Sequence, residues 1–209
     1  MVTHHFIYGM ENMQIDFNQL SKSQKYYLMT QVILPRPIAW VLSEHANSKL
    51  NLAPFSYFNG VSSEPPLLMI SVGRKRDGSP KDTWTNILER RHFVVHLASQ
   101  QDKQALEASA FSYDQGISEC EELNLKTTPM ANASLPRLTN ARVALFCHLY
   151  KILEVGEGSQ ALILGQIESS YVDDSCIEVD NRKMTIDPEK LDPLGRLGGT
   201  SYCGIQVSE

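Results

Sequence analysis

The sequence SVGRKRDGSPKDTWTN, residues 71–86, combines a strand end, a tight turn and a helix start. Asp77-Gly78 is a turn dipeptide, and Ser79-Pro80 is typical of an N-cap followed by the first helical position, where proline is tolerated. The first N–H groups of such a helix have no intrahelical partner and lie at the positive end of the helix dipole. The segment therefore predicts a strand–turn–helix unit whose helix N-terminus can accept an anion.

Polar side chains at this helix start suit a phosphate group. Lys81 supplies an ammonium group, and Ser79 and Thr83 supply hydroxyls. A carboxylate would repel a phosphate, so Asp82 is expected to orient Lys81 or to cap the helix. A plain helix cap without a ligand is the alternative, because Ser-Pro caps and Lys-Asp pairs open many helices. The local pattern leaves both interpretations open.

Further motifs lie on both sides of this unit. They are PRPIAWV at residues 35–41, NLAPFSYFN at 51–59, SSEPP at 62–66 and GRLGG at 195–199. Together with GSPKDT at 78–83, their order and spacing resemble the flavin reductase-like family of FMN-binding split-barrel proteins, over residues 14–202. The resemblance implies a mainly β fold, an FMN-binding split β-barrel of Greek-key antiparallel type with a few flanking helices. It also implies one domain over residues 14–209, preceded by an N-terminal extension over residues 1–13.

The resemblance places FMN on specific residues of this chain. The segment 51–56 matches the part that runs along the isoalloxazine, and residues 71 and 73 match a strand end that approaches the flavin. Residues 79–83 match the phosphate clamp, and the loop at 196–202 matches a cover over the cofactor. The cofactor-binding residues that follow are Arg36, Asn51, Ala53, Pro54, Phe55, Ser56, Ser71, Gly73, Ser79, Lys81, Asp82, Thr83, Arg196 and Gly198.

The function implied by the resemblance is that of an FMN-dependent oxidoreductase that accepts hydride from NADH or NADPH. The flavin would carry the chemistry, so no catalytic side chain is expected. The resemblance also implies a homodimer with FMN near the subunit interface. An FMN-binding electron carrier without nicotinamide turnover is the alternative, and a redox-silent interaction protein is a weaker one. Arg74 and Arg76 either meet a ribose phosphate or are solvated turn charges, and Arg36 either serves the cofactor or stacks on a neighbouring strand.

Hydrophobic periodicity predicts the elements around these motifs. Residues 20–31 predict an amphipathic helix that packs on the barrel. Residues 83–91 predict a helix with Trp84, Ile87 and Leu88 facing the core, and residues 116–137 predict a polar surface excursion. The other predicted elements are a hairpin of 38–43 with 50–58, strands at 67–72 and 93–98, a helix at 101–110, and a long hairpin of 142–155 with 161–172.

Composition excludes several other classes. The chain has 209 residues, of which 42% are hydrophobic and 21% charged, with a net charge of -5 and one basic cluster at 74–76, so general nucleic-acid binding is not expected. No apolar run reaches membrane-spanning length, and the cytoplasm is the expected location. The four cysteines lie far apart and His92 and His96 are too distant to share an ion, so neither disulfides nor a metal site is expected. The G-x-G-x-x-G and G-x-S-x-G motifs are absent.

Overall fold

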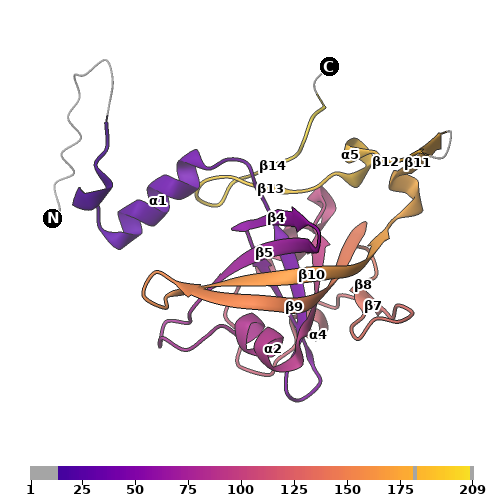
Figure 1. The fold of residues 1–209 in the computed structure, drawn as a ribbon, viewed down its shortest axis with the longest axis horizontal. Helices are drawn as coiled ribbons and strands as arrows, with labels where there is room; N and C mark the ends of the chain where they lie inside the picture. The colour runs from indigo at the N-terminus through magenta and orange to yellow at the C-terminus, as the bar shows by residue number, and fades with distance from the viewer. Residues whose placement is uncertain (1–13, 181–182, 208–209) are drawn as a thin grey trace.

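A seven-stranded antiparallel sheet forms the body of the computed structural model, with the strand order β3-β2-β6-β9-β10-β5-β4. The structure describes residues 14–180 and 183–207, so the predicted N-terminal extension lies outside the described residues. The strands of this sheet are β2 (Ala39–Glu44), β3 (Leu50–Phe55), β4 (Phe58–Ser63), β5 (Pro66–Gly73), β6 (His92–Leu97), β9 (Val143–Val155) and β10 (Gln160–Val172). Strand β3 also approaches β5, so the sheet curls toward closure (Figure 1).

Short helices and three small sheets surround this body. The helices are α1 (Lys22–Val32), α2 (Asp82–Arg90), α3 (Lys103–Ala108), α4 (Glu119–Glu122) and α5 (Pro188–Leu191), with 3-10 turns at Phe17–Gln19, Gln100–Asp102 and Asp174–Cys176. The small sheets comprise β1 (Arg36–Pro37), β13 (Gly195–Arg196) and β14 (Tyr202–Cys203); β7 (Thr127–Thr128) and β8 (Arg137–Leu138); and β11 (Ile177–Asp180) and β12 (Lys183–Ile186). The prediction of a mainly β, antiparallel fold with a few flanking helices is confirmed.

Two hydrophobic clusters lie on the two sides of the central strands. The barrel interior collects side chains from β2, β3, β5, β6, β9 and β10 and is filled from one end by Trp84 and Ile87 of α2. The outer core lies on the other side of β2, β6 and β9, where α3, α4 and the segment 133–141 cover it. Both parities of β9 near Ala144 to Cys147 are therefore largely buried, whereas β10 alternates between buried and partly exposed residues.

Three details of the predicted elements are wrong. Leu88 of α2 is 53% exposed, because the helix turns only its Trp84 and Ile87 side into the barrel. The excursion at 116–137 contributes Cys120 and Leu135 to the outer core, so it is a cover and not a surface loop. Helix α1 buries only Thr30; most of it extends away from the barrel in Figure 1, and it contacts the rest of the fold through Tyr26 and its C-terminal end.

Glu119 explains why α4 is held against the barrel. Its buried carboxylate accepts a hydrogen bond from the backbone N–H of Leu52 at 2.8 Å, on the outer side of edge strand β3. Burial raises the pKa of Glu119, against the lowering effect of this hydrogen bond. The contact pairs a backbone group of an edge strand that would otherwise lack a partner.

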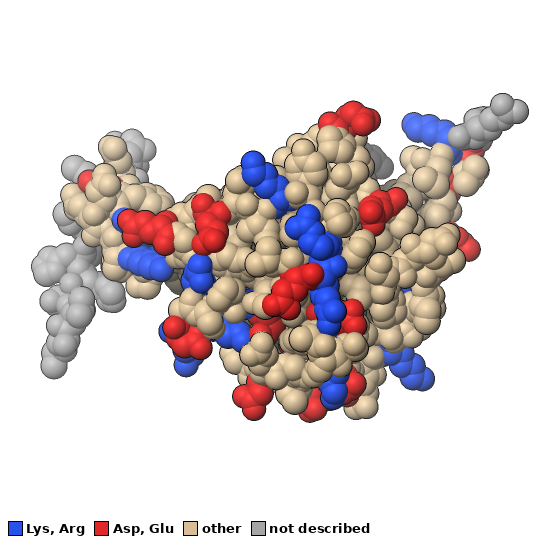
Figure 2. Space-filling view, turned by 60° about the horizontal axis from the view of Figure 1, so that its bottom comes forward, with Lys and Arg blue, Asp and Glu red and all other residues tan. Residues whose placement is uncertain are grey.

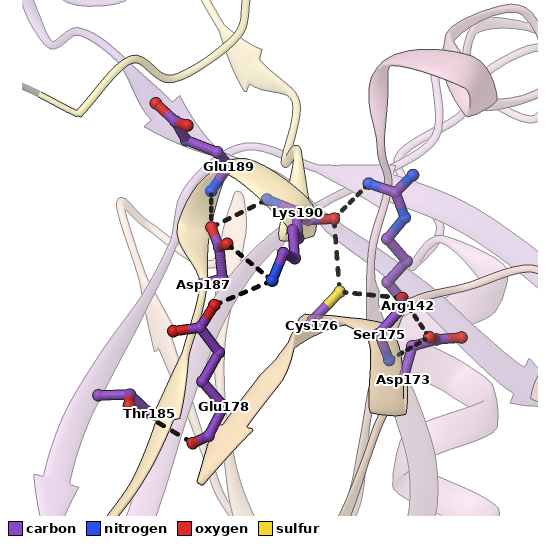
Figure 3. Close-up of polar contacts among 9 residues, drawn as sticks. All are labelled: Arg142, Asp173, Ser175, Cys176, Glu178, Thr185, Asp187, Glu189 and Lys190. Atoms are coloured by element: carbon purple, nitrogen blue, oxygen red, sulfur yellow. Dashed lines mark hydrogen bonds and ion pairs between the residues drawn. The ribbon is translucent and has the colours of Figure 1, made fainter. Parts of the chain in front are cut away.

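One carbonyl group at the end of helix α5 contacts both Arg142, next to β9, and Cys176, before the ribbon β11–β12 (Figure 3). The backbone oxygen of Lys190 accepts from Nη1 of Arg142 at 2.5 Å and from the thiol of Cys176 at 3.4 Å. Asp187 caps α5, and the Lys190 ammonium lies 2.9 Å from Glu178 and 3.4 Å from Asp187. Cys176 is therefore a packed thiol, and all four cysteines are free.

Gly165 of β10 is a position where a side chain would collide with the barrel interior. A Cβ there would lie 2.3 Å from Cζ of Phe93 and 3.3 Å from Cβ of Cys147. Gly165→Ala is expected to destabilise the protein by about 1–3 kcal/mol, because both neighbours are buried and cannot move aside freely. Chemical denaturation measures this loss. Gly60→Ala is the control, since its Cβ would have nothing within 4 Å, and an equal loss in both variants would contradict the packing argument.

Charged residues of both signs are interspersed over the face in Figure 2, and no broad basic patch forms there. None of the helices in the described ranges has the length and apolar character needed to cross a membrane.

Candidate functional site

The residues before α2 form a tight loop that differs from the predicted cap. Helix α2 begins at Asp82, and Lys81 occupies the N-cap position without a side-chain capping bond. The N–H and hydroxyl of Ser79 both donate to Oδ1 of Asp77, at 2.9 and 2.6 Å. The predicted Ser79-Pro80 cap is therefore wrong, because an aspartate two residues earlier captures the serine in a turn of its own.

Asp82 does not orient Lys81. Its Oδ1 lies 2.7 Å from Nζ of Lys75, at the other end of the loop. Lys81 is exposed, with its ammonium 5.8 Å from the centre of the Phe55 ring. Within the described residues, no carboxylate lies within ion-pair distance of Lys81. The helix start thus presents one uncompensated cation beside the N–H groups that open α2.

Arg74 holds this loop in place and is not a solvated turn charge. Its guanidinium donates to the carbonyls of Gly158 and Gly78, at 2.5 and 3.2 Å, and to Oε2 of Glu154 at 3.0 Å. It also stacks over the ring of Trp84, 4.7 Å from the ring centre. Arg74 therefore fastens the loop and α2 to the turn of the β9–β10 hairpin.

Asn51 and Thr83 meet in a buried polar contact between β3 and α2. Nδ2 of Asn51 donates to Oγ1 of Thr83 at 3.0 Å and to Oγ of Ser43 at 3.1 Å. Ala53 and Phe55, two and four residues further along β3, also face the barrel interior. The helix start and one face of β3 therefore bring together Asn51, Phe55, Lys81 and Thr83.

The end of β5 is covered by a residue that the sequence did not single out. Gln160 of β10 pairs with Gly73, and its Oε1 accepts from the Ser71 hydroxyl at 3.2 Å. A Cβ on Gly73 would lie 3.3 Å from Nε2 of Gln160. The register of β10 against β5 determines this contact, and no local sequence motif marks it.

The remaining predicted residues gather at a separate cavity of about 280 Å³. Arg36, Pro54, Ser56 and Arg196 line it, together with Gly199 and Tyr202 of the closing loop. The side chains that sequence reasoning missed come from α1, from the residue after β1, and from α3 and the turn that follows it: Tyr26, Tyr27, Thr30, Ile38, Leu106 and Ala110. Gly198 does not line it; its Cα faces Gln31 of α1, where a Cβ would lie 2.3 Å from the side chain. We call this space the tyrosine cavity.

Arg36 ties together the segments that form the cavity. It is 4% exposed, and Nη1 donates to the carbonyls of Thr30 and Ile33 at the end of α1, at 2.8 and 2.9 Å. Nη2 donates to the carbonyl of Leu197 at 2.9 Å, and Nε to the hydroxyl of Ser56 at 3.3 Å. Arg36 therefore caps the C-terminal end of α1 while it lines the cavity, and its role toward a cofactor stays a prediction.

His96 is buried and lies outside both regions. Its Nδ1 lies 3.2 Å from the carbonyl of Trp40, and its Nε2 accepts from the N–H of Leu138 at 3.0 Å. A neutral ring with the proton on Nδ1 satisfies both partners. The pKa of His96 is lowered from 6.5 to about 4, mainly by burial and also by the nearby Arg137 charge, against the raising effect of the Trp40 bond. In the part of the chain that the structure describes, no group of three metal-ligating side chains is arranged to hold an ion.

Comparison with known proteins identifies the class. A family model for the flavin reductase-like domain matches residues 29–184, and the chain belongs to this family. Nitrilotriacetate monooxygenase component B from Bacillus cereus is 31% identical, with a TM-score of 0.88 over 96% of this chain and 99% of its own. The 2-nitrobenzoate 2-nitroreductase NbaA of Pseudomonas fluorescens is 32% identical, with a TM-score of 0.83 over 94% and 96%.

A third structure shows the fold alone. It is a protein with a split barrel domain from Shewanella frigidimarina, 18% identical, with a TM-score of 0.81 over 95% of this chain and 98% of its own. The split-barrel prediction is confirmed. The family and these relatives support a flavin-related oxidoreductase function.

Proposed function

We propose that the protein is an oxidoreductase that binds FMN and reduces it with NADH or NADPH. The observation that carries the proposal is the uncompensated Lys81 ammonium at the N-terminus of α2, beside a fixed loop, in a chain of the flavin reductase-like family. When bound, the flavin would accept hydride from the nicotinamide and pass electrons onward. The protein's part is then to bind, orient and shield the cofactor.

The helix start fits the phosphate end of FMN. Lys81 supplies the charge, the first N–H groups of α2 supply donors, and Arg74 keeps the loop in one conformation. Thr83 is held by Asn51, so its role is to join β3 to this end of the site. Ser79 and Asp82 shape the loop through Asp77 and Lys75, and neither is proposed to touch the phosphate.

The outer side of β3 fits the ring end of FMN. The N–H of Leu52 points outward to Glu119, so by strand alternation the backbone nitrogen of Pro54 also faces outward. Pro54 has no N–H, and β3 ends at Phe55, so Ser56, the first residue after the strand, offers the next backbone donor. This donor and the Ser56 hydroxyl are the groups that we propose for polar atoms of the isoalloxazine.

Anaerobic rapid mixing tests the function directly. FMN-loaded protein is mixed with NADH or with NADPH, and the flavin absorbance is followed. Loss of the flavin absorbance within seconds of mixing, or faster, supports the proposed oxidoreductase function. A protein that binds FMN but is not bleached by either nucleotide would be an electron carrier, and a protein that binds no FMN would be a redox-silent barrel.

Lys81→Ala is expected to lower FMN affinity by about ten- to a hundredfold. A charge-assisted contact contributes roughly 1.5–3 kcal/mol, and no other described cation is proposed for the phosphate. Quenching of FMN fluorescence during titration measures the affinity. The matched control is Arg76→Ala, which removes an exposed cation from the same loop. Equal affinities in the wild-type protein and Lys81→Ala would remove Lys81 from the site.

We also propose a homodimer with FMN near the interface. Helix α1 and its flanks carry exposed apolar side chains that would be costly to leave in water, namely Ile15, Phe17, Tyr26, Tyr27, Met29, Val32, Ile33 and Leu34. Two of these residues, Tyr26 and Tyr27, line the tyrosine cavity. Dilution should therefore lower the mass measured by light scattering and the bound FMN together. A monomer that retains all of its FMN would contradict the proposal.

A further inference from the structure

Two arginines face each other across the short sheet beside the tyrosine cavity. Arg36 of β1 and Arg196 of β13 are directly paired in antiparallel register, and both line the cavity. Directly opposite like charges destabilise a strand pair, since their Cβ atoms lie about 4.5–5.5 Å apart. The fold nevertheless places both guanidinium groups at one small space.

The protein supplies little negative charge to balance this pair. No Asp or Glu lines the cavity, and neither arginine forms an ion pair with a described residue. Arg36 donates to carbonyls at the C-terminus of α1, whose dipole is equivalent to about half a negative charge. Arg196 donates to the Tyr202 hydroxyl and to the carbonyl of Gly199, at 2.5 Å for the latter. A net positive charge therefore remains at the cavity.

A buried donor lies beside the same charges. The hydroxyl of Tyr57 is buried and has no hydrogen-bond partner among the described residues. Its ring packs edge-on against Tyr26, with ring centres 6.4 Å apart. Burial and Tyr26 raise the pKa of Tyr57, and the Arg36 guanidinium lowers it. Buried hydroxyls without a partner are rare in native structures.

The other walls of the cavity are flat or apolar. Tyrosine rings come from positions 26, 27 and 202, and Ile38, Pro54 and Leu106 supply aliphatic surface. The Arg196 guanidinium also lies over the Tyr202 ring, 4.6 Å from its centre. A volume of about 280 Å³ lies just below the usual range of about 300–1,000 Å³ for small-molecule sites. The cavity is thus suited to one small ring with an anionic group, not to a dinucleotide.

From this arrangement we infer that the tyrosine cavity binds a small aromatic carboxylate, with its carboxylate at the Arg196 guanidinium beside the positive charge of Arg36 and its ring between the tyrosines. A guanidinium binds a carboxylate with directed, charge-assisted hydrogen bonds, and aromatic walls favour a flat ring. An inorganic phosphate would satisfy the charge but not the apolar walls. This inference rests on the proposed function, because the cavity is a second ligand site only if the protein also binds FMN.

Benzoate is the probe, and the purified full-length chain is titrated calorimetrically, with and without saturating FMN. FMN binding is measured separately by fluorescence. Benzamide, a neutral molecule of the same shape, tests the charge. Arg196→Gln removes one guanidinium, and Arg196→Lys keeps the charge but loses the planar donor geometry. The control is Lys103→Gln, because the Lys103 ammonium lies 5.4 Å from the Tyr202 ring centre but does not line the cavity.

Benzoate is expected to bind one site per chain with and without FMN. Benzamide should bind at least about tenfold more weakly, as should benzoate to Arg196→Gln, with Arg196→Lys in between and Lys103→Gln unchanged. Equal binding of benzoate and benzamide, or an unaffected Arg196→Gln, would overturn the inference. Displacement of benzoate by FMN or by inorganic phosphate would overturn it too, since the cavity would then belong to the flavin or its phosphate. If the chain binds no FMN but shows the expected benzoate pattern, the proposed function fails while the carboxylate site stands.

Discussion

When the pH falls from about 6.5 toward 4, His96→Gln is expected to lose about 3 kcal/mol less of its free energy of unfolding than the wild-type protein does. In the folded protein the pKa of His96 is lowered from 6.5 to about 4, mainly by burial and also by the Arg137 charge, against the raising effect of the hydrogen bond to Trp40. In the unfolded chain the ring accepts a proton near its ordinary pKa. Between those two values the unfolded state binds more protons, so stability is fully present above about pH 6.5 and falls as the pH drops toward 4.

The measurement is the free energy of unfolding as a function of pH, for the wild-type protein and for His96→Gln. Other groups titrate in this range, and the raised pKa of Glu119 acts in the opposite sense, so only the difference between the two curves is informative. His92→Gln is the control, because His92 lies in the same strand with a side chain that is 38% exposed. Parallel curves for the wild-type protein and His96→Gln would show that His96 does not carry this proton linkage.

The sequence predicted the fold better than the positions of side chains within the site. The hairpin of β9 and β10 and the strand–turn–helix unit at 71–86 are encoded locally, by apolar runs and by turn residues. The cap at Ser79 was misplaced by two residues, because Asp77 competes for the same hydroxyl. The Ser79 hydroxyl can either cap the helix or donate to Asp77, and the sequence is compatible with both hydrogen bonds.

The division of the predicted site into two regions follows from strand alternation. The family resemblance assigns all of the motif at 51–56 to one binding surface for FMN. Successive side chains of a strand, however, point to opposite faces. Asn51 and Phe55 therefore meet α2, while Pro54 and Ser56 meet the tyrosine cavity. This split was available from the period-2 rule alone. The contributions of Tyr26 and Tyr27 were not, since they depend on where α1 lies relative to the barrel.

Long-range contacts account for the remaining omissions. Gln160 reaches Ser71 through the β10–β5 register, and Glu119 reaches Leu52 across 67 positions of the chain. Neither residue belongs to a local pattern that marks a site. The sequence therefore predicts where the helix start and the closing loop lie. Which side chains contact these segments depends on long-range pairing, such as the register of the sheet, that no local pattern shows.

Arg36→Met is expected to lower the free energy of unfolding by about 3 kcal/mol and to release α1 from the barrel. The variant keeps an aliphatic side chain of similar reach but leaves the carbonyls of Thr30, Ile33 and Leu197 without their charged donor. Arg36→Lys should recover little of the loss, because one ammonium cannot donate in the three directions that the guanidinium fork spans. Chemical denaturation measures the stability of both variants.

A second measurement distinguishes local detachment of α1 and the closing loop from a general packing defect. Amide hydrogen exchange should accelerate more in residues 22–34 and 195–203 than in the hairpin of β9 and β10, because Arg36 connects those two segments to the body of the fold. Arg76→Met is the control, as an exposed arginine in another loop. Uniform acceleration across the whole chain, or full stability in Arg36→Lys, would show that Arg36 contributes bulk and charge but does not hold α1 and the closing loop around the tyrosine cavity.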